Sequence, residues 1–296
     1  MSRLSYLVVV SVLIVVSWAD DHDFRVPLNG TRGAPNFATK PHHEVGKRHR
    51  SYDQGMNQCH PFELGLGYYY QMDIMLKPDV VDSVVPVVYT KYRWPGARVP
   101  YVIKGVFCEF FLATTQRTII SKAIAQYTAS TCVRFVPRTT EATFVTIDSS
   151  PTGCWSYIGR SLNNSYNLVN LQVPNCITTG TVAHELMHAL GFYHEFTRTD
   201  RDNYVTIDTG ALDPKYQTVS FYNANYAKLA ANLTPLYGIP YNYGSVMHYS
   251  KWAGAYNQSR PVMNNIKPWT GDFGNKIGLA ATDIQAINFM YACPLQ

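Results

Sequence analysis

Apolar and polar residues fall into distinct blocks along the first third of the chain. Residues 7–16 are almost continuously apolar, and residues 20–55 are polar with no helical or strand period. From Trp94 onward the pattern becomes regular, and apolar positions at helical spacing predict a helix over residues 115–130. Three runs predict strands: residues 99–103, 132–136 and 142–147. We therefore expect a flexible leader ahead of a folded domain that contains both helices and strands.

The N-terminus has the three parts of a secretory signal peptide. Arg3 supplies a positive charge, residues 7–16 supply an apolar core, and small residues at Ser17 and Ala19 suit a signal peptidase. The alternative is an uncleaved membrane anchor, but the apolar run is shorter than the roughly 20 residues that a spanning helix needs. We therefore expect residues 1–19 to be a cleaved signal and the protein to be secreted and extracellular, with no stable membrane anchor.

Secretion changes how the cysteines and asparagines are interpreted. In an oxidising compartment the six cysteines are expected to pair, and six cysteines can pair in about 15 ways. Four asparagines lie in Asn-x-Ser/Thr sequons and are candidates for glycosylation: Asn29, Asn163, Asn232 and Asn257.

Composition limits the class of protein. Only 15% of the 296 residues are charged, which excludes an acidic disordered protein and a coiled coil. The net charge of +5 is modest, and a secreted chain with this charge is not expected to bind nucleic acid. The basic run at residues 47–50 has three interpretations, namely a polyanion site, a processing site or a solvated stretch.

The segment from His184 to His194 carries the strongest chemical signal. Residues four apart on a helix share a face, so His184 and His188 can direct both imidazoles at one ion. Gly191 can end the helix in a left-handed conformation and turn the chain, so that His194 becomes the third ligand. Three protein ligands leave a position for water, which is typical of a catalytic zinc site.

Glu185 lies beside these ligands and can supply acid–base chemistry. Zinc lowers the pKa of a bound water to about 7, and Glu185 can accept its proton and pass it to a leaving amine. The full His-Glu-x-x-His-x-x-Gly-x-x-His pattern is the metzincin signature. A methionine-containing turn follows it in metzincins, and Met247 is expected to form this apolar floor beneath the metal. The adjacent His248 is expected to be structural.

Four segments together resemble the astacin metalloendopeptidases, a metzincin family. They are residues 132–138, 153–159, 194–205 and 243–249. The resemblance covers about residues 94–293 and implies an α+β metzincin fold. That fold has a twisted mixed sheet with helices in its upper half, an irregular lower half, and a cleft between them. We expect a monomer with one Zn²⁺ per chain and protein or peptide substrates.

The resemblance also implies roles for individual residues. Tyr249 would be a further zinc ligand that can swing away and hydrogen-bond the oxyanion. Glu195 would pair with the buried amino terminus of the mature enzyme, because either charge alone would be costly to bury. The implied disulfides are Cys132–Cys293 and Cys154–Cys176.

The leader resembles an astacin propeptide. Residues 70–74 align with the family's Phe-x-Gly-Asp switch, so Asp73 would bind the zinc in place of water and block catalysis. Tyr70 and Met72 depart from this pattern, and Met72 replaces the glycine that lets the backbone approach closely. The expected divisions are a signal peptide at 1–19, a propeptide at 20–84 and a catalytic domain at 85–296, with the mature chain beginning near Val85.

Cys59 and Cys108 fall outside the family's pairs. One lies in the leader and the other in the expected enzyme, so a Cys59–Cys108 disulfide would tether the leader after cleavage. A free thiol on Cys108 would exclude this pairing.

Two basic residues, Lys276 and Arg260, follow the methionine turn in the region that shapes the primed-side subsite of this family. A basic residue there would favour an acidic side chain after the scissile bond, and a solvated Lys or Arg is the alternative.

These signals together predict a secreted zinc endopeptidase made as a zymogen and inhibited by its own propeptide. The alternative is a catalytically silent, secreted binding glycoprotein that keeps the metzincin shell. The presence of Glu185 and of all three histidines favours the enzyme.

Overall fold

The computed structural model describes residues 26–27, 39–52, 59–77, 83–84, 90–104 and 113–294. Several sequence predictions therefore lie outside the described residues: the signal peptide at 1–19, the start of the mature chain near Val85, the sequon at Asn29, and Cys108. Across the described residues, no helix combines the length and the apolar character that crossing a membrane requires.

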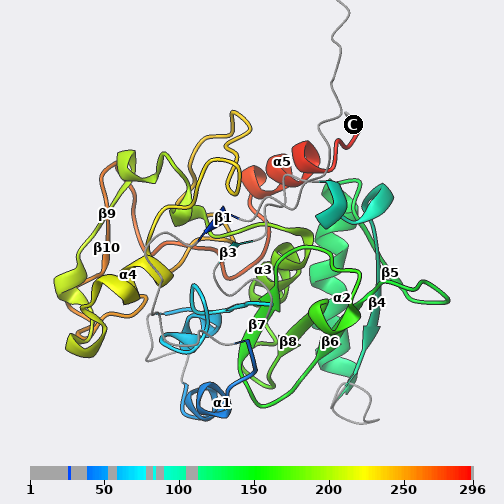
Figure 1. Ribbon diagram of the computed structural model, residues 1–296, viewed down its shortest axis with the longest axis horizontal. Helices are drawn as coiled ribbons and strands as arrows, with labels where there is room; N and C mark the ends of the chain where they lie inside the picture. The colour runs from blue at the N-terminus through cyan, green and yellow to red at the C-terminus, as the bar shows by residue number, and fades with distance from the viewer. Residues whose placement is uncertain are drawn as a thin grey trace, which may run out of the picture.

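A mixed sheet organises one half of the molecule, and six strands of the described chain form it (Figure 1). In spatial order they are β2 (Ile74–Met75), β7 (Cys154–Tyr157), β8 (Leu168–Leu171), β6 (Val145–Asp148), β4 (Arg98–Ile103) and β5 (Arg134–Pro137). Strand β7 runs antiparallel to β8, and the other neighbours are parallel. The three strands predicted from the sequence are confirmed as β4, β5 and β6, with bounds that differ by up to three residues.

Helices α2 (Ala113–Ser130) and α3 (Thr179–Leu190) pack against each other and against this sheet. Ile120 and Tyr127 of α2 and Leu186 of α3 are fully buried in one core. The Tyr127 hydroxyl donates to the carbonyl oxygen of Ala183 at 2.6 Å, so a buried polar group joins the two helices. The helix predicted over residues 115–130 is confirmed as α2.

The other half, on the left of Figure 1, is less regular. It contains α4 (Val219–Asn225) and the antiparallel pair β9 (Val205–Ile207) and β10 (Met263–Asn265), and the chain ends after α5 (Ala281–Met290). Short 3-10 helices join the elements of both halves: η3 (Thr90–Tyr92), η4 (Pro95–Ala97), η6 (Asn164–Tyr166), η7 (Glu195–Thr197), η8 (Arg201–Asn203), η9 (Thr209–Ala211) and η10 (Pro214–Tyr216).

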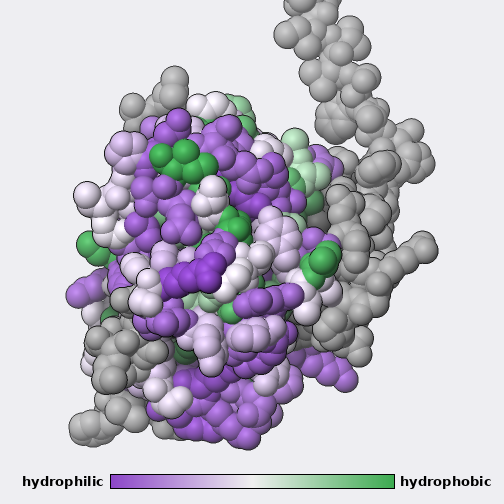
Figure 2. All heavy atoms as spheres, turned by 90° about the vertical axis from the view of Figure 1, so that its left-hand side faces the viewer, coloured by the Kyte–Doolittle hydropathy of each residue, from purple (hydrophilic) through white to green (hydrophobic). Residues whose placement is uncertain are grey.

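Figure 2 looks onto the less regular half and shows a mainly hydrophilic surface with scattered apolar residues. The predicted α+β class is confirmed.

The leader contains regular structure, so the prediction of an aperiodic segment over residues 20–55 is wrong in part. His43–Arg50 form helix α1, Pro61–Gly65 form η1, and β1 (Val26–Pro27) pairs with β3 (Ser83–Val84). The sequence pattern missed α1 because a helix of two turns is marginal by itself and depends on packing against the rest of the fold.

The basic run at residues 47–50 is the last turn of α1, and its members have different environments. Arg48 donates to the carbonyl oxygens of Leu64 and Leu66 at 3.0 and 2.7 Å. His49 is buried, whereas Lys47 and Arg50 are exposed. The solvated interpretation therefore fits only half of this run.

The leader lies between the sheet and the irregular half, where the cleft was predicted. Strand β2 adds to the sheet edge in parallel with β7, with Ile74 opposite Ser156. On the other side, the Gln71 N–H donates to the carbonyl oxygen of Ala224 at 3.2 Å. The Ser250 N–H donates to Oε1 of Glu63 at 2.6 Å, so the leader binds both halves.

Candidate metal centre

Two local signals set the ends of α3. The Thr178 hydroxyl accepts from the Thr181 N–H at 3.1 Å and caps the N-terminus. At the other end Gly191 has a φ of 117°, a left-handed conformation that glycine adopts without strain, and the helix stops there as the sequence predicts.

Three imidazoles converge where the chain turns back after Gly191. Nε2 of His184 lies 3.4 Å from Nε2 of His194, and all three histidines are at most 1% exposed. Each Nδ1 faces an oxygen that can only accept: Val246 O for His184 at 2.7 Å, Phe192 O for His188 at 2.7 Å and Gln71 Oε1 for His194 at 2.8 Å. Each Nδ1 therefore carries the hydrogen, and each Nε2 presents a lone pair to the common point.

Asp73 of the leader completes this cluster. Its Oδ2 lies 2.9 Å from Nε2 of His184 and 3.2 Å from Nε2 of His194, and its Oδ1 lies 3.4 Å from Nε2 of His188. Lone pairs that converge in this way repel one another unless a cation lies among them. Nitrogens 3.4 Å apart fit two ligands at about 2.0–2.1 Å from one tetrahedral zinc, so the donor set fits this metal.

Burial sets the protonation of the cluster. Desolvation lowers the pKa of His188 to about 3 and holds the pKa of His184 well below its usual value, so both rings are neutral near pH 7. It also raises the pKa of Asp73 well above the usual range for a carboxyl. Neutral imidazole is the form that binds a metal, and a bound cation would restore the ionised form of Asp73.

Glu185 is fully buried beside this cluster. Neither of its carboxyl oxygens has a hydrogen-bond partner among the described residues. Burial raises its pKa well above the usual value, and the nearby Asp73 carboxyl adds to this effect. Leaving a buried carboxyl unsatisfied is costly, and such groups concentrate at functional sites.

The segment around Met247 packs behind the histidines. Met247 is buried, and its carbonyl oxygen accepts from the Glu195 N–H at 2.9 Å. Nε2 of His248 accepts from the Tyr241 hydroxyl at 2.6 Å, and its Nδ1 donates to the carbonyl oxygen of Tyr249 at 2.8 Å. Both nitrogens of His248 are therefore used in packing, which agrees with a structural role.

The leader holds the side chain of Tyr249. The hydroxyl donates to the backbone carbonyl oxygen of Gln71, and the ring centroid lies 4.4 Å from that of His194. The zinc-ligand role of Tyr249 stays a prediction that concerns the chain without its leader.

Glu195 follows the third histidine and borders a separate small cavity. Its Oε1 accepts from the Asn242 N–H at 2.9 Å and from Nη1 of Arg198 at 3.2 Å. Burial is the main influence on its carboxyl and raises its pKa to about 7. The cavity has a volume of about 60 Å³, and Asp283 and apolar side chains also line it. The pairing of Glu195 with a mature amino terminus stays a prediction.

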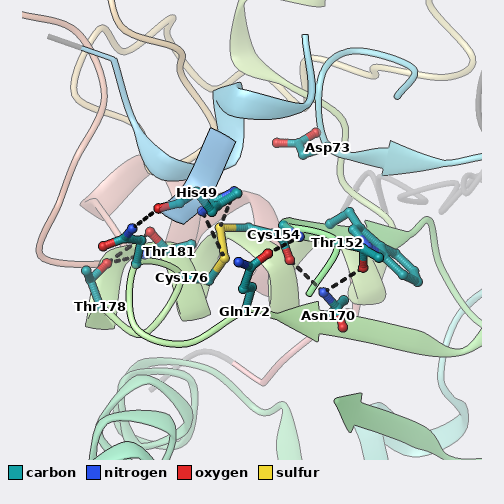
Figure 3. Close-up of a disulfide and its surroundings, with 12 residues drawn as sticks. His49, Asp73, Thr152, Cys154, Asn170, Gln172, Cys176, Thr178 and Thr181 are labelled. Carbon is teal, nitrogen blue, oxygen red and sulfur yellow. Dashed lines mark hydrogen bonds between the residues drawn. A yellow bond between two sulfur atoms is a disulfide. The ribbon is translucent and has the colours of Figure 1, made fainter. Parts of the chain in front are cut away.

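Both disulfides implied by the resemblance are present. Cys132–Cys293 joins the segment before β5 to the segment after α5, and Cys154–Cys176 joins β7 to the segment before α3. Figure 3 shows the second disulfide with the ring of His49 from α1 directly beside its sulfur atoms.

The other covalent predictions concern the Cys59–Cys108 pair and the glycosylation sequons. Cys59 forms no disulfide with any described residue, and Cys108 lies outside them, so their pairing stays a prediction. Asn163 and Asn257 are exposed and Asn232 is half-buried, and their glycosylation also stays a prediction.

The two candidate specificity residues lie in different surroundings. Lys276 lines a cavity of about 230 Å³ together with Phe62, whose ring stacks on His184 with centroids 3.8 Å apart. Arg260 instead forms an ion pair with Asp208 at 2.7 Å. Lys276 is therefore the better candidate for a subsite beside the metal centre.

Sequence reasoning missed two leader residues that contact the site. Gln71 holds His194 through its side chain, and Phe62 stacks on His184. The position of Gln71 two residues before Asp73 was visible in the sequence, but nothing in the pattern showed which atoms it would contact.

Comparison with known proteins agrees with this geometry. The profile of the Astacin family of peptidases matches residues 87–292. The chain is 36% identical over 209 residues to the zinc metalloproteinase nas-14 of Caenorhabditis elegans, and the match covers 70% of this chain and 39% of that protein. It is 35% identical over 208 residues to nas-7 of the same organism, covering 69% of this chain and 49% of that protein. The chain thus spans less than half the length of these relatives.

A solved structure of a zinc-protease is also similar to this chain. High choriolytic enzyme 1, a hatching enzyme zinc-protease from Oryzias latipes, aligns with a TM-score of 0.57 and 32% sequence identity. The alignment covers 68% of this chain and 94% of that chain. Because the family profile spans most of the chain and includes α3 with all three histidines, the chain belongs to the astacin family of zinc peptidases.

Proposed function

We propose that this chain is a secreted zinc endopeptidase that is made as an inactive zymogen. The observation that carries the proposal is the carboxylate of the leader residue Asp73, which lies where the Nε2 atoms of the three histidines converge. A carboxylate there takes the position that a catalytic water would need. One Zn²⁺ per chain would serve the site, and the family match supports peptide hydrolysis.

The leader would also block the path of a substrate backbone. Strand β2 pairs with β7 at the edge of the sheet, and the Ser156 N–H donates to the carbonyl oxygen of Asp73 at 2.9 Å. Extended peptides commonly bind by adding a strand to a free sheet edge. Removal of the leader would free β7 to bind a protein or peptide substrate in this way.

After the leader leaves, Glu185 would act as the general base. Zinc, when bound, supplies the Lewis acidity that makes water a nucleophile near neutral pH and polarises the scissile carbonyl. Glu185 accepts the proton of the attacking water and passes it to the nitrogen of the leaving amine as the C–N bond breaks. Its raised pKa suits a carboxyl that must both accept and release this proton.

Tyr249 would act on the carbonyl oxygen of the scissile bond. In this structure its hydroxyl donates to Gln71. Departure of the leader would release the hydroxyl, whose oxygen would then bind the zinc in the enzyme without substrate. During turnover it would donate a hydrogen bond to the developing oxyanion, the position at which a fixed donor stabilises the transition state.

Activation would create a new amino terminus near Val85. The cavity beside Glu195 would receive this terminus, and its ammonium group would pair with the carboxylate. Either charge alone would be costly to bury, so the pair would form only in the cleaved enzyme. Secretion through the signal at residues 1–19 agrees with the two disulfides, which persist in oxidising compartments.

Hydrolysis by the purified full chain tests the proposal. The secreted zymogen is cut with a panel of added endopeptidases and assayed on casein, with and without 1,10-phenanthroline. We expect chelator-sensitive cleavage only after the cut. Absence of such cleavage from every cut preparation would contradict the proposal and favour a silent binding glycoprotein.

Glu185→Gln is the matched control. It should lower turnover by roughly 100-fold or more while the zinc content, measured by atomic absorption, stays the same. Turnover that survives this change would show that the base is another residue.

A further inference from the structure

We propose that the catalytic domain carries a second docking site for the leader, separate from the metal centre. Residues 151–154 and 172–176 form it, helix α1 occupies it, and it keeps the leader bound after the chain has been cut. The inference rests on the proposed function in one respect, since it treats residues 20–84 as a propeptide.

A glycine on each side of the contact lets α1 lie close to the domain. A Cβ atom at Gly46 would lie 1.8 Å from the carbonyl oxygen of Pro151. A Cβ atom at Gly153 would lie 2.5 Å from Cγ1 of Val45. Each surface therefore presents a glycine where the other surface approaches, and a side chain at either position would push α1 away.

Two amide side chains of the domain bind the backbone of α1. Nε2 of Gln172 donates to the carbonyl oxygen of Gly46 at 3.0 Å, while Oε1 of the same residue accepts from the Gly153 N–H at 2.8 Å. Nδ2 of Asn175 donates to the carbonyl oxygen of His49 at 2.5 Å. The His49 carbonyl lies in the last turn of α1, where carbonyl oxygens lack the regular helical partner four residues on, so the domain adds a cap to this helix.

His49 covers the Cys154–Cys176 disulfide (Figure 3). Its Nε2 lies 3.9 Å from Sγ of Cys154, and its Nδ1 lies 3.9 Å from Sγ of Cys176. The histidine is 1% exposed, and both cysteines are buried. Departure of α1 would uncover this face of the disulfide, so its rate of reduction by a thiol reports whether the helix is docked.

Besides the chain itself, hydrogen bonds join the docked helix to the part of the leader that precedes Asp73. Arg48 donates to the carbonyl oxygens of Leu64 and Leu66, and the N–H of His42, the N-cap of α1, donates to the Tyr69 hydroxyl at 2.9 Å. A cut near Val85 would leave both α1 and Asp73 on the same released fragment. Two linked contacts hold a fragment far more tightly than either contact alone, so the cut leader would leave slowly, and peptidase activity would rise after the cut only as α1 undocks.

Gly46→Ala in the full-length zymogen tests the site. Alanine is a better helix former than glycine, so a loss of docking could not be attributed to a weaker helix. Lys47→Ala is the control, because Lys47 is exposed and pairs only with Glu44 of the same helix among the described residues. The zymogens are treated with dithiothreitol, and the thiols released are alkylated and identified by mass spectrometry.

We expect the half-time for reduction of Cys154–Cys176 to fall about tenfold in Gly46→Ala and to stay unchanged in Lys47→Ala. Cys132–Cys293 serves as an internal reference whose half-time should be the same in all three proteins. This readout uses a Cys59→Ala background, which removes the predicted disulfide tether to Cys108. After cutting with an added endopeptidase, the leader should co-elute with the catalytic domain when residue 46 is glycine and separate from it in Gly46→Ala.

Equal reduction half-times and equal co-elution for wild type and Gly46→Ala would overturn the proposal. Where Gly46→Ala is not secreted, Asn175→Ala decides by the same two readouts, because it removes a donor to α1 from the domain side. Neither readout needs peptidase activity. A chain that never cleaves casein would therefore contradict the proposed function while the docking site was still tested.

Discussion

The side-chain oxygen of Gln71 lies 2.8 Å from Nδ1 of His194. The backbone carbonyl of the same residue accepts from the Tyr249 hydroxyl, and two residues later Asp73 lies among the Nε2 atoms of the three histidines. One short leader segment thus contacts a candidate ligand histidine and a tyrosine and places a carboxylate among the three candidate ligands. Its release would free all three together, which couples removal of the leader to completion of the site.

Replacing Asp73 tests whether a ligand, and not bulk alone, blocks the site. Asp73→Ala removes the carboxylate and leaves the rest of the leader in place. We expect the uncut chain to hydrolyse a fluorogenic peptide at least about tenfold faster than the wild-type zymogen, because water could reach the metal. Glu44 is another leader carboxylate, in the first turn of α1 and away from the histidines, so Glu44→Ala is the control and should leave the zymogen inactive. An uncut Asp73→Ala chain that stays inactive would show that steric blocking suffices.

Met72 has a left-handed backbone with a φ of 67°, and its side chain is fully buried. The conformation costs about 1–2 kcal/mol for a residue with a Cβ atom, while burial of the methionine contributes about 1.5–3 kcal/mol. These opposing terms explain how methionine replaces the family's glycine here. Met72→Ala keeps the backbone strain and loses the stabilisation from the buried side chain. Met72→Gly loses the same stabilisation but also relieves the strain.

The glycine variant of Met72 should therefore be more stable than the alanine variant, by about 1 kcal/mol in urea unfolding of the zymogen. Ala125→Gly, at an exposed position within α2, is the control and should show the usual order, with glycine less stable by about 1 kcal/mol. An alanine variant of Met72 that matched or exceeded the glycine variant would argue against strain at this position.

Glu195→Gln should affect the cut and the uncut protein differently. In the uncut chain burial already holds the pKa of Glu195 at about 7, so a neutral amide costs little. In the cut enzyme the change would leave the buried ammonium of the new terminus without its partner, a loss of about 3–5 kcal/mol. Thermal unfolding of both forms measures the difference. Glu141→Gln is the control, because it alters an ion pair with Arg98 and should cost the same in both forms. Equal losses in the two forms would rule out the pairing.

Acid should weaken the docking of α1 through His49. Burial lowers the pKa of His49 to about 4, against about 6.5 for an exposed histidine. The undocked state therefore binds more protons between these values. Docking is strongest above pH 6.5 and weakens as the pH falls toward 4, by up to about 3 kcal/mol. The ring faces Gly153 and a disulfide, which do not titrate, and the other charged or titratable residues of its own helix are His43, Glu44, Lys47, Arg48 and Arg50.

Comparison with His49→Gln isolates this effect, because His60 and Glu63 are also buried in the leader and titrate in both proteins. Retention of the cut leader is measured by gel filtration at pH 7.5 and pH 5, with Cys59→Ala in both proteins so that no disulfide tethers the leader. We expect wild type to lose about tenfold more affinity than His49→Gln over this interval. The same loss in both proteins would assign the pH dependence to other groups.

Local sequence determined much of the half of the molecule that contains the sheet, α2 and α3. The spacing of His184, His188 and His194 predicts a shared site because helical periodicity places residues four apart on one face, and Gly191 ends α3 where the pattern requires. The apolar period of residues 115–130 predicts α2 for the same reason. These features depend on neighbours a few residues apart, so they can be recognised without the fold.

Tertiary structure alone decided how the leader binds. Helix α1 has only eight residues and few of them are apolar, and its docking depends on Gly46 meeting Pro151 more than one hundred residues away. The contacts of Gln71 with His194 and of His49 with a disulfide likewise join segments distant in the chain. Periodicity reports which face of an element is buried, but it carries no information about which distant surface covers that face. For this protein the sequence determined the chemistry of the metal centre, and the packed structure decided which groups of the leader restrain it.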